Sequence, residues 1–244
     1  MINLVMPMAG RGSRFTKEGY TTPKPLIQIN GKPFFYWSIR SIEKFVNLSS
    51  LIVVVLQEHI DDFHIDQKIK KYFPKAEIVA ITEVTEGAVI TSLKGSEKIT
   101  NDKPIVFNDC DHMFYCPDFY TFCKTKDISE VDGGLLTFTS NEPKYSFAEL
   151  DKNGHFVRTV EKVAVSDHAI CGAYYFKDKN TFETSAKTYL KDCEYSEYFM
   201  SGVYNVLAKE GKNIVIFSTD TQVGFGTTEE YKEAKMSSKF SLLN

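Results

Sequence analysis

Two hydrophobic patterns take turns over the first half of the chain. Short, mainly apolar runs are typical of buried parallel strands, and they lie at residues 4–6, 51–56, 77–81 and 104–107. Between them, apolar positions recur at helical spacing and predict helices that each bury one face, at 33–45, 60–73 and 87–99. This alternation predicts an α/β fold with a doubly wound, mostly parallel, Rossmann-like sheet and helices on both faces.

The pattern changes after residue 130. Strands are predicted at 134–139, 146–150, 156–160, 169–176 and 213–217, and helices at 179–190, 197–209 and from 228 onward. The pair Asn153-Gly154 predicts a hairpin turn because these residues readily adopt positive φ angles. No linker or repeat divides the chain, so we predict a single domain, 1–244. It would consist of a first half, 1–130, and a second half, 131–244, with an inserted mixed sheet.

Composition and charge exclude some classes of partner. The chain has 244 residues, of which 43% are hydrophobic, enough to bury a sizeable core. With 29 basic and 32 acidic residues and no basic stripe, a nucleic-acid partner is not expected. The longest apolar run, 51–56, is too short to span a bilayer, so no membrane partner is expected either.

The cysteines and the first residues bear on the compartment. The chain contains 5 cysteines, an odd set without a Cys-x-x-Cys pair, which is typical of reduced thiols. Its first residues enter the first predicted strand without the charged and apolar segments of a signal peptide. We therefore expect a cytoplasmic protein.

A glycine-rich segment follows the first predicted strand. It reads Gly10-Arg11-Gly12-Ser13-Arg14, and glycines in such a turn let backbone N–H groups approach phosphate oxygens closely. Arg14 offers a planar fork for phosphate, and Lys24, held between Pro23 and Pro25, offers a point charge. The segment is therefore predicted to grip a polyphosphate.

Two better-known phosphate motifs do not fit this segment. A P-loop would end in Gly-Lys-Ser/Thr, where this chain has Ser13-Arg14-Phe15. A dinucleotide fingerprint needs a third glycine and an acidic residue at the end of the next strand, which here ends in Leu56-Gln57. A nicotinamide-dependent oxidoreductase is therefore not expected.

Two carboxylates follow the predicted strand at 104–107. Ligands bind at the carboxyl ends of parallel strands, and a carboxylate there can hold Mg²⁺ together with substrate phosphates. Asp109 and Asp111 are two positions apart on an extended segment, so both could face the same way. We favour Asp111 as the metal ligand and keep Asp109 as the alternative.

The run Gly10-x-Gly12-x-Arg14 followed by Pro23-Lys24 resembles the signature of nucleotidyltransferases that join a nucleoside triphosphate to a sugar phosphate or another small phosphate. The resemblance implies that 1–130 binds nucleotide and 131–244 binds the acceptor. It gives catalytic roles to Arg14, at the leaving pyrophosphate, and to Lys24, at the α-phosphate. It also implies nucleotide contacts at Met8, Ala9, Gly10, Gly12 and Ser13.

The resemblance extends along most of the chain. Thr85-Glu86-Gly87-Ala88 is similar to the segment that lies against the base, which implies nucleotide contacts at Thr85, Gly87 and Ala88. Asp111 matches the family's metal-binding aspartate, and Asp109 is assigned to the nucleotide side. On the acceptor side, Lys162 would contact the acceptor phosphate, with further contacts implied at Glu161, Gly172 and Tyr198.

One position departs from the pattern. Many members carry a second metal-binding aspartate in Asp-x-Gly-Thr, whereas this chain reads Gly224-Phe225-Gly226-Thr227. A regulatory nucleotide-binding module that has lost its chemistry therefore stays open beside an Mg²⁺-dependent enzyme. Oligomeric state also stays open, a homo-oligomer included.

The opening residues also resemble the capsule-type branch of the family. The run 7–15, Pro-Met-Ala-Gly-Arg-Gly-Ser-Arg-Phe, carries this likeness. That branch includes cytidylyltransferases, among them the CTP:phosphoglutamine cytidylyltransferases. The likeness favours CTP over UTP, dTTP or GTP and implies a role in capsule or cell-surface polysaccharide precursors.

Overall fold

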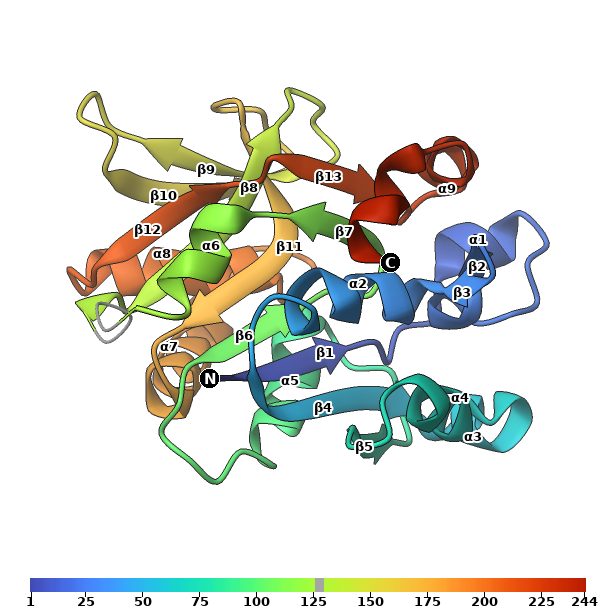
Figure 1. Cartoon of the computed structure of the whole chain (residues 1–244). Helices are drawn as coiled ribbons and strands as arrows, with labels where there is room; N and C mark the ends of the chain where they lie inside the picture. Colours follow the sequence, from blue (N-terminus) through green and yellow to red (C-terminus); the bar gives the residue numbers. More distant parts are fainter. Residues whose placement is uncertain (126–129) are drawn as a thin grey trace.

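A large mixed sheet forms the centre of the protein. The computed structural model describes residues 1–125 and 130–244 (Figure 1). The strands of the sheet are β1 (Ile2–Pro7), β4 (Leu48–Leu56), β5 (Glu77–Ile81), β6 (Ile105–Asn108), β8 (Gly133–Thr139), β9 (Ser146–Leu150), β10 (Phe156–Glu161), β11 (His168–Phe176) and β12 (Ile214–Ser218). Their order is β10-β9-β11-β6-β1-β4-β5, with β8 against β11 and β12 against β8.

The N-terminal part of this sheet is parallel. β1 pairs in parallel with both β4 and β6, and β4 pairs in parallel with β5. β11 then joins β6 in the antiparallel sense and starts the mixed part of the sheet. The predicted α/β class with a Rossmann-like sheet is confirmed, and one sheet runs through both predicted halves.

Helices cover both faces of the sheet. They are α1 (Ser13–Lys17), α2 (Phe34–Glu43), α3 (Gln57–Phe63), α4 (Ile65–Tyr72), α5 (Ala88–Ser96), α6 (Pro117–Phe122), α7 (Lys179–Asp192), α8 (Met200–Lys209) and α9 (Thr228–Lys235). Side chains alternate along β1, so Leu4 and Met6 pack in the core that contains α2, α4 and α6. Val5 points the other way, into the core that contains α5, α7 and α8.

The prediction of one helix over 60–73 was wrong. α3 begins directly after β4, and His64, with φ 52°, separates it from α4. This left-handed residue redirects the chain so that Ile65 and Ile69 of α4 are fully buried. Hydrophobic spacing cannot reveal such a break, because both short helices keep their apolar residues on the core side.

The hairpin between β9 and β10 forms, but its turn differs from the prediction. Only Gly154 of the Asn153-Gly154 pair has positive φ, at 85°. The Asp151 carboxylate instead closes the loop by accepting hydrogen bonds from the backbone N–H groups of Asn153 and His155, both at 2.8 Å.

Several short elements have no counterpart in the sequence prediction. β2 (Gln28–Ile29) and β3 (Lys32–Pro33) form a small hairpin, and η1 (Lys24–Leu26) is a turn of 3-10 helix just before it. β7 (His112–Tyr115) pairs with β13 (Thr221–Gly224), which brings the segment after β13 beside the end of β6. These strands are too short to leave a periodic pattern.

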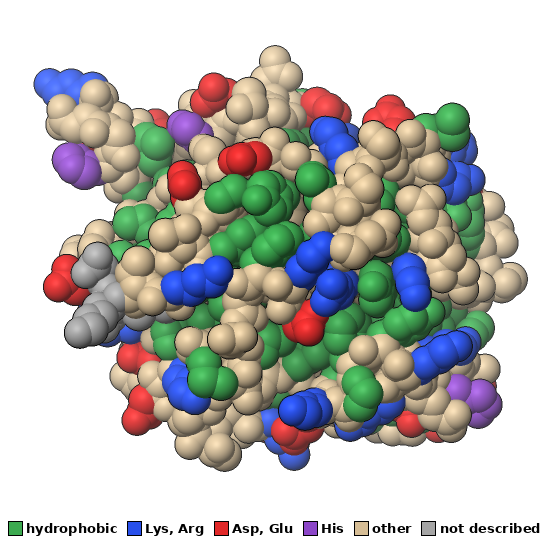
Figure 2. All heavy atoms as spheres, in the orientation of Figure 1, with side chains coloured by type: hydrophobic (Ala, Val, Ile, Leu, Met, Phe, Trp, Pro, Cys, Tyr) green, Lys and Arg blue, Asp and Glu red, His purple; other side chains and the backbone are tan. Residues whose placement is uncertain are grey.

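The division of the domain at 130/131 stays a prediction. It adjoins residues 126–129, which lie outside the described residues. In the described ranges, no helix is both long and apolar enough to cross a membrane. On the face drawn in Figure 2, basic and acidic side chains are interspersed and do not form a basic stripe.

Candidate active site

The glycine-rich loop lies directly against Lys24. β1 ends at Pro7, the loop follows, and α1 begins at Ser13. Gly12 has φ 61°, and a Cβ atom there would lie 2.8 Å from the Cβ of Lys24. Only glycine therefore lets the loop pack this closely against the residue that starts η1.

Lys24 forms an ion pair with Asp111. The Nζ atom of Lys24 donates to Oδ2 of Asp111 at 2.8 Å, and their side chains are 24% and 25% exposed. Burial alone would lower the pKa of Lys24 and raise that of Asp111. Because each charge stabilises the other, the pKa of Lys24 is raised and that of Asp111 is lowered. The two residues that the resemblance assigns to phosphate and metal therefore meet in space.

Asp109 lies beside this pair, and its pKa is shifted in the opposite direction from that of Asp111. Burial and then the charge of Asp111 raise its pKa to about 7. Its backbone N–H donates to the carbonyl of Gly172 at 2.9 Å. A Cβ atom at Gly172, where φ is 89°, would come within 2.8 Å of the Asp109 carboxylate. Gly172 thus leaves room for that side chain.

His112 is a buried structural neighbour. Its Nε2 lies 3.0 Å from Oδ1 of Asn108, and burial lowers the pKa of the ring to about 4. Near neutral pH the ring is therefore uncharged.

Two of the predicted acceptor residues, Glu161 and Lys162, lie at the end of β10. Glu161 is buried and accepts a short hydrogen bond from the hydroxyl of Ser201 on α8. The next residue, Lys162, has φ 55°, and its Nζ lies 4.9 Å from the centre of the Phe199 ring. This sharp change in backbone direction places two successive charged side chains at the same cavity.

The segment after β13 completes the site. A Cβ atom at Gly226 would lie 2.7 Å from Oδ2 of Asp111, and one at Gly224 would lie 3.3 Å from the Glu230 carboxylate. Glu230 accepts hydrogen bonds from Tyr145 at 2.8 Å and from Lys144 at 3.0 Å. The carboxylate of Glu230, on α9, thus lies close to Gly224, the position at which many nucleotidyltransferases with the resembling signature have aspartate.

One cavity of about 470 Å³ joins most of these groups; Lys24 does not line it, but its partner Asp111 does. Among the predicted residues that line it are Arg14, Asp109, Asp111, Glu161, Lys162 and Gly172. The cavity is also lined by residues that the sequence did not indicate, among them Lys144, Tyr145 and Glu230. Of these, only Glu230 left a signal, since Thr227-x-x-Glu230 is a helix capping pattern.

The remaining predicted residues lie outside this cavity. Met8 and Ala9 are only 2% and 3% exposed, so both residues are almost wholly buried. Gly10 and Ser13 are exposed at the loop. Thr85, Gly87, Ala88 and Tyr198 form a group of their own.

The backbone of Gly87 packs closely against the backbone of Tyr198. A Cβ atom there would lie 2.5 Å from the backbone nitrogen of Tyr198. Tyr198 donates to the carbonyl of Glu86 and accepts from the N–H of Val89, both at 3.1 Å. These contacts join the segment predicted to bind nucleotide to the segment predicted to bind the acceptor. Nothing in the sequence alone indicated that the two segments touch.

A family comparison agrees with this geometry. The Nucleotidyl transferase family model matches residues 4–239, which is nearly the whole chain. The chain belongs to this family. The match is continuous and includes the Gly10–Arg14 loop, Lys24 and Asp111.

Individual relatives of this chain are distant. It is 26% identical over 212 residues to the bifunctional protein GlmU of Methanocaldococcus jannaschii, a match covering 86% of this chain and 48% of the relative. The chain thus spans about half the length of that protein. It is 23% identical over 193 residues to the glucose-1-phosphate cytidylyltransferase of Salmonella typhimurium, covering 70% and 73% of the two chains.

Solved structures share the fold. The nucleoside-diphosphate-sugar pyrophosphorylase from Vibrio cholerae RC9 superposes with a TM-score of 0.82 at 24% identity, covering 96% of this chain and all of the other. The inositol-1-phosphate CTP transferase from T. maritima superposes with a TM-score of 0.76 at 14% identity, covering 99% and 94%. These likenesses support the Rossmann-like architecture of the transferase.

The donor set bears on a divalent metal. Within residues 1–125 and 130–244, no group of three or more His, Cys, Asp and Glu side chains is arranged to hold a metal ion. Asp111 offers one hard oxygen ligand, and Mg²⁺ in phosphate-transferring sites needs only one or two carboxylates besides substrate phosphates. The residues present therefore fit an ion that arrives with a triphosphate.

Proposed function

We propose that this chain transfers a nucleoside monophosphate from a nucleoside triphosphate to a small phosphorylated acceptor and releases pyrophosphate. The observation that carries the proposal is the 2.8 Å ion pair of Lys24 with Asp111, a carboxylate that lines one cavity together with Arg14 and Lys162. Arg14, Lys144 and Lys162 give the cavity wall positive charge, which suits a reaction in which phosphate charges must be brought together. The wall also carries the carboxylates of Asp109, Asp111, Glu161, Glu197 and Glu230.

The proposed reaction needs no general base. A phosphate monoester has a second pKa of about 6, so its attacking oxygen is already ionised near neutral pH. That oxygen bonds to the α-phosphorus while the bond to the β-phosphate oxygen breaks and pyrophosphate leaves. Lys162 would hold the attacking phosphate, Lys24 the α-phosphate and Arg14 the leaving group, so catalysis rests on positioning and charge neutralisation.

Mg²⁺ is part of the proposal, with Asp111 as its protein ligand. Bound there, the ion would neutralise charge on the triphosphate oxygens. Lys24 would then exchange its contact with Asp111 for one with phosphate, because the carboxylate and the α-phosphate compete for the same ammonium group.

The finer substrate assignment is CMP transfer from CTP in a capsule-type cytoplasmic pathway. The resemblance of residues 7–15 and the cytidylyltransferase among the relatives support CTP. Phosphoglutamine, glucose 1-phosphate and inositol 1-phosphate are the acceptors that these likenesses suggest.

A regulatory module is the second candidate, and the segment around Gly224 favours it. Gly224 has no carboxylate, and the nearby Glu230 carboxylate already accepts hydrogen bonds from Lys144, Tyr145 and the N–H groups of Gly226 and Thr227. So many partners reduce its availability to a metal ion.

A substrate panel separates the two candidates. CTP, UTP, dTTP and GTP are each combined with the three acceptors, and pyrophosphate release is measured with Mg²⁺ and after chelation. We expect release with CTP to be highest and to stop on chelation. Saturable nucleotide binding without pyrophosphate release from any pair would favour the regulatory module, and higher activity with another triphosphate would remove the CTP assignment.

A further inference from the structure

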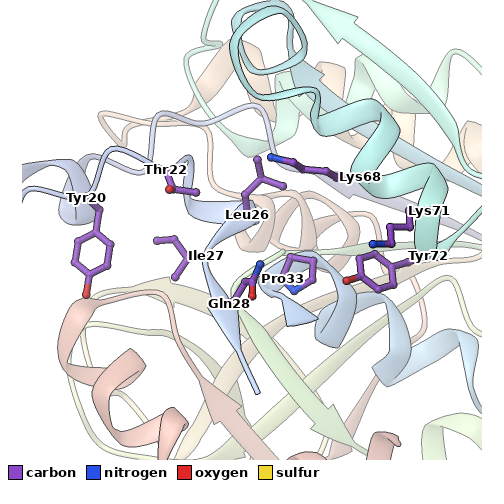
Figure 3. Close-up of a pocket in the computed structure, with 9 residues that line it drawn as sticks. All are labelled: Tyr20, Thr22, Leu26, Ile27, Gln28, Pro33, Lys68, Lys71 and Tyr72. Atoms are coloured by element: carbon purple, nitrogen blue, oxygen red, sulfur yellow. The ribbon is translucent and has the colours of Figure 1, made fainter. Parts of the chain in front are cut away.

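A second cavity lies on the far side of the segment that carries Lys24. Its volume is about 560 Å³, within the range of sites that hold small molecules. Figure 3 shows the nine residues that line it, which come from residues 20–33 and from α4: Tyr20, Thr22, Leu26, Ile27, Gln28, Pro33, Lys68, Lys71 and Tyr72. None of them lines the candidate active site.

The charged residues that line this cavity are all basic. Lys68 and Lys71 extend from α4 toward the segment that carries Leu26 and Gln28 (Figure 3). In the described part of the chain, neither lysine lies within ion-pair distance of a carboxylate, and no acidic residue lines the cavity. Thr22 and Gln28 add a hydroxyl and an amide, so the polar groups include several donors suited to an anion.

The rest of the wall is apolar and already held in place. Leu26 and Ile27 are 6% and 5% exposed, and Pro33 adjoins them. The ring of Tyr72 is fixed between two neighbours: the Nζ atom of Lys32 lies 4.8 Å from its centre, and the Tyr36 ring packs against it at 5.1 Å. A ligand would therefore meet a preformed surface for a flat or apolar body.

We propose that this cavity binds a small phosphate ester, with its phosphate at Lys68 and Lys71 and its apolar body against Leu26, Ile27 and Tyr72. Two unpaired ammonium groups select the dianionic phosphate, and the apolar wall selects an ester over free phosphate. The site is separate from the triphosphate and acceptor positions of the proposed reaction.

The position of the cavity links it to Lys24. Leu26 is the last residue of η1. Two hydrogen bonds hold this turn: the N–H of Leu26 donates to the carbonyl of Pro23 at 2.8 Å, and the N–H of Ile27 donates to the carbonyl of Lys24 at 3.2 Å. A ligand that contacts Leu26 and Ile27 therefore contacts the same turn that presents Lys24 to Asp111. Occupancy of the cavity would restrict the movement of this turn.

Phenyl phosphate is a suitable probe because it joins a phosphate to an aromatic ring. Its binding is measured by calorimetric titration at low salt on the wild type and on the double variant Lys68→Gln/Lys71→Gln. The matched control is Lys70→Gln/Lys75→Gln, which removes the same charge from exposed lysines of the same region outside the cavity. Lys162→Gln reports separately on binding at the proposed acceptor site.

We expect Lys68→Gln/Lys71→Gln to weaken one binding process by roughly fivefold or more, and the control pair by less than about twofold. Inorganic phosphate should bind this site more weakly than phenyl phosphate, because it has no apolar body. In NMR spectra, the backbone amides of Ile27, Gln28 and Tyr72 should shift on titration of the wild type.

Three results would overturn the proposal. They are equal affinity in the Lys68→Gln/Lys71→Gln variant and the wild type, equal weakening by the control pair, or loss of all binding in Lys162→Gln alone. The last result would leave the proposed transferase activity intact, whereas failure of the substrate panel would leave this second site unaffected.

Discussion

At the scale of single residues, Lys24 carries the most chemical information. Its neighbours in sequence, Pro23 and Pro25, restrict the backbone, but its function depends on Asp111, 87 positions away. The ion pair keeps Lys24 charged and Asp111 ionised, as their proposed roles at phosphate and metal require. Gly12 is part of the same arrangement because any larger residue would displace Lys24.

We expect Lys24→Ala to lower turnover by at least about tenfold, or roughly 1.4 kcal/mol of transition-state stabilisation, because it removes the charge at the α-phosphate. Steady-state pyrophosphate release with the best substrate pair measures this. Lys17→Ala, which removes an exposed cation from nearby α1, is the control and should have little effect. Near-normal turnover of Lys24→Ala would contradict the assigned role, and a thermal melt checks that the variant folds.

At the scale of elements, the start of α9 connects helix stability to the site. The side-chain hydroxyl of Thr227 accepts a hydrogen bond from the N–H of Glu230 at 3.2 Å, and the Glu230 carboxylate accepts one from the N–H of Thr227 at 3.1 Å. This capping box also fixes the carboxylate that Lys144 and Tyr145 contact. The helix start thereby holds Glu230 beside Asp111 and the turn at Gly226.

Thr227→Ala should reduce the free energy of unfolding by about 1 kcal/mol. The N–H of Glu230 loses its side-chain partner, and the Glu230 carboxylate that accepts from the N–H of residue 227 is held less firmly. Urea denaturation measures the change. Thr227→Ser keeps the hydroxyl and should stay within about 0.5 kcal/mol of the wild type. If both variants were equally destabilised, the methyl group rather than the cap would be responsible.

At the scale of the whole molecule, the last described segment packs back onto the N-terminal half. η3 (Ser238–Leu243) buries Phe240, whose ring centre lies 4.7 Å from that of Trp37 on α2. Phe225, just after β13, packs in the same cluster. The C-terminal strands and helices are thereby held over the glycine-rich loop, where they complete the site around Asp111.

Phe240→Ala should therefore destabilise the protein by about 3 kcal/mol, the lower part of the range for truncating a buried phenylalanine. Trp37, the single tryptophan, should emit at longer wavelength because its ring becomes more exposed. Urea unfolding followed by fluorescence tests both effects. Leu242→Ala, at a 41% exposed position of the same segment, is the matched control and should change neither quantity much. An unchanged emission maximum for Phe240→Ala would contradict this packing.

Much of the fold could be predicted because its core elements carry strong periodic signals. β4 is a nearly continuous apolar run, and α2 repeats apolar residues on one face, so both were recognised from sequence. The break at His64 and the β7–β13 pair could not be predicted. A left-handed residue leaves no hydrophobic signature, and four-residue strands are shorter than any useful window.

The candidate site divides in the same way. Arg14, Lys24 and Asp111 were predicted from local patterns and from the family resemblance, and Lys162 was predicted from the resemblance. Lys144 and Tyr145 were missed because their role arises only where the loop before β9 meets Glu230 of α9. Pairing between segments 85 residues apart leaves no local trace in a single sequence.

By itself, the sequence determined the α/β class, the glycine-rich loop after β1 and the carboxylates at the end of β6, because each follows from residue types at short spacing. Only the tertiary structure decided that Lys24 pairs with Asp111, that Glu230 lies beside Gly224, and that a second basic cavity lies behind η1. Attraction between charges and steric exclusion between side chains depend on distances in space, and only the folded chain sets those distances.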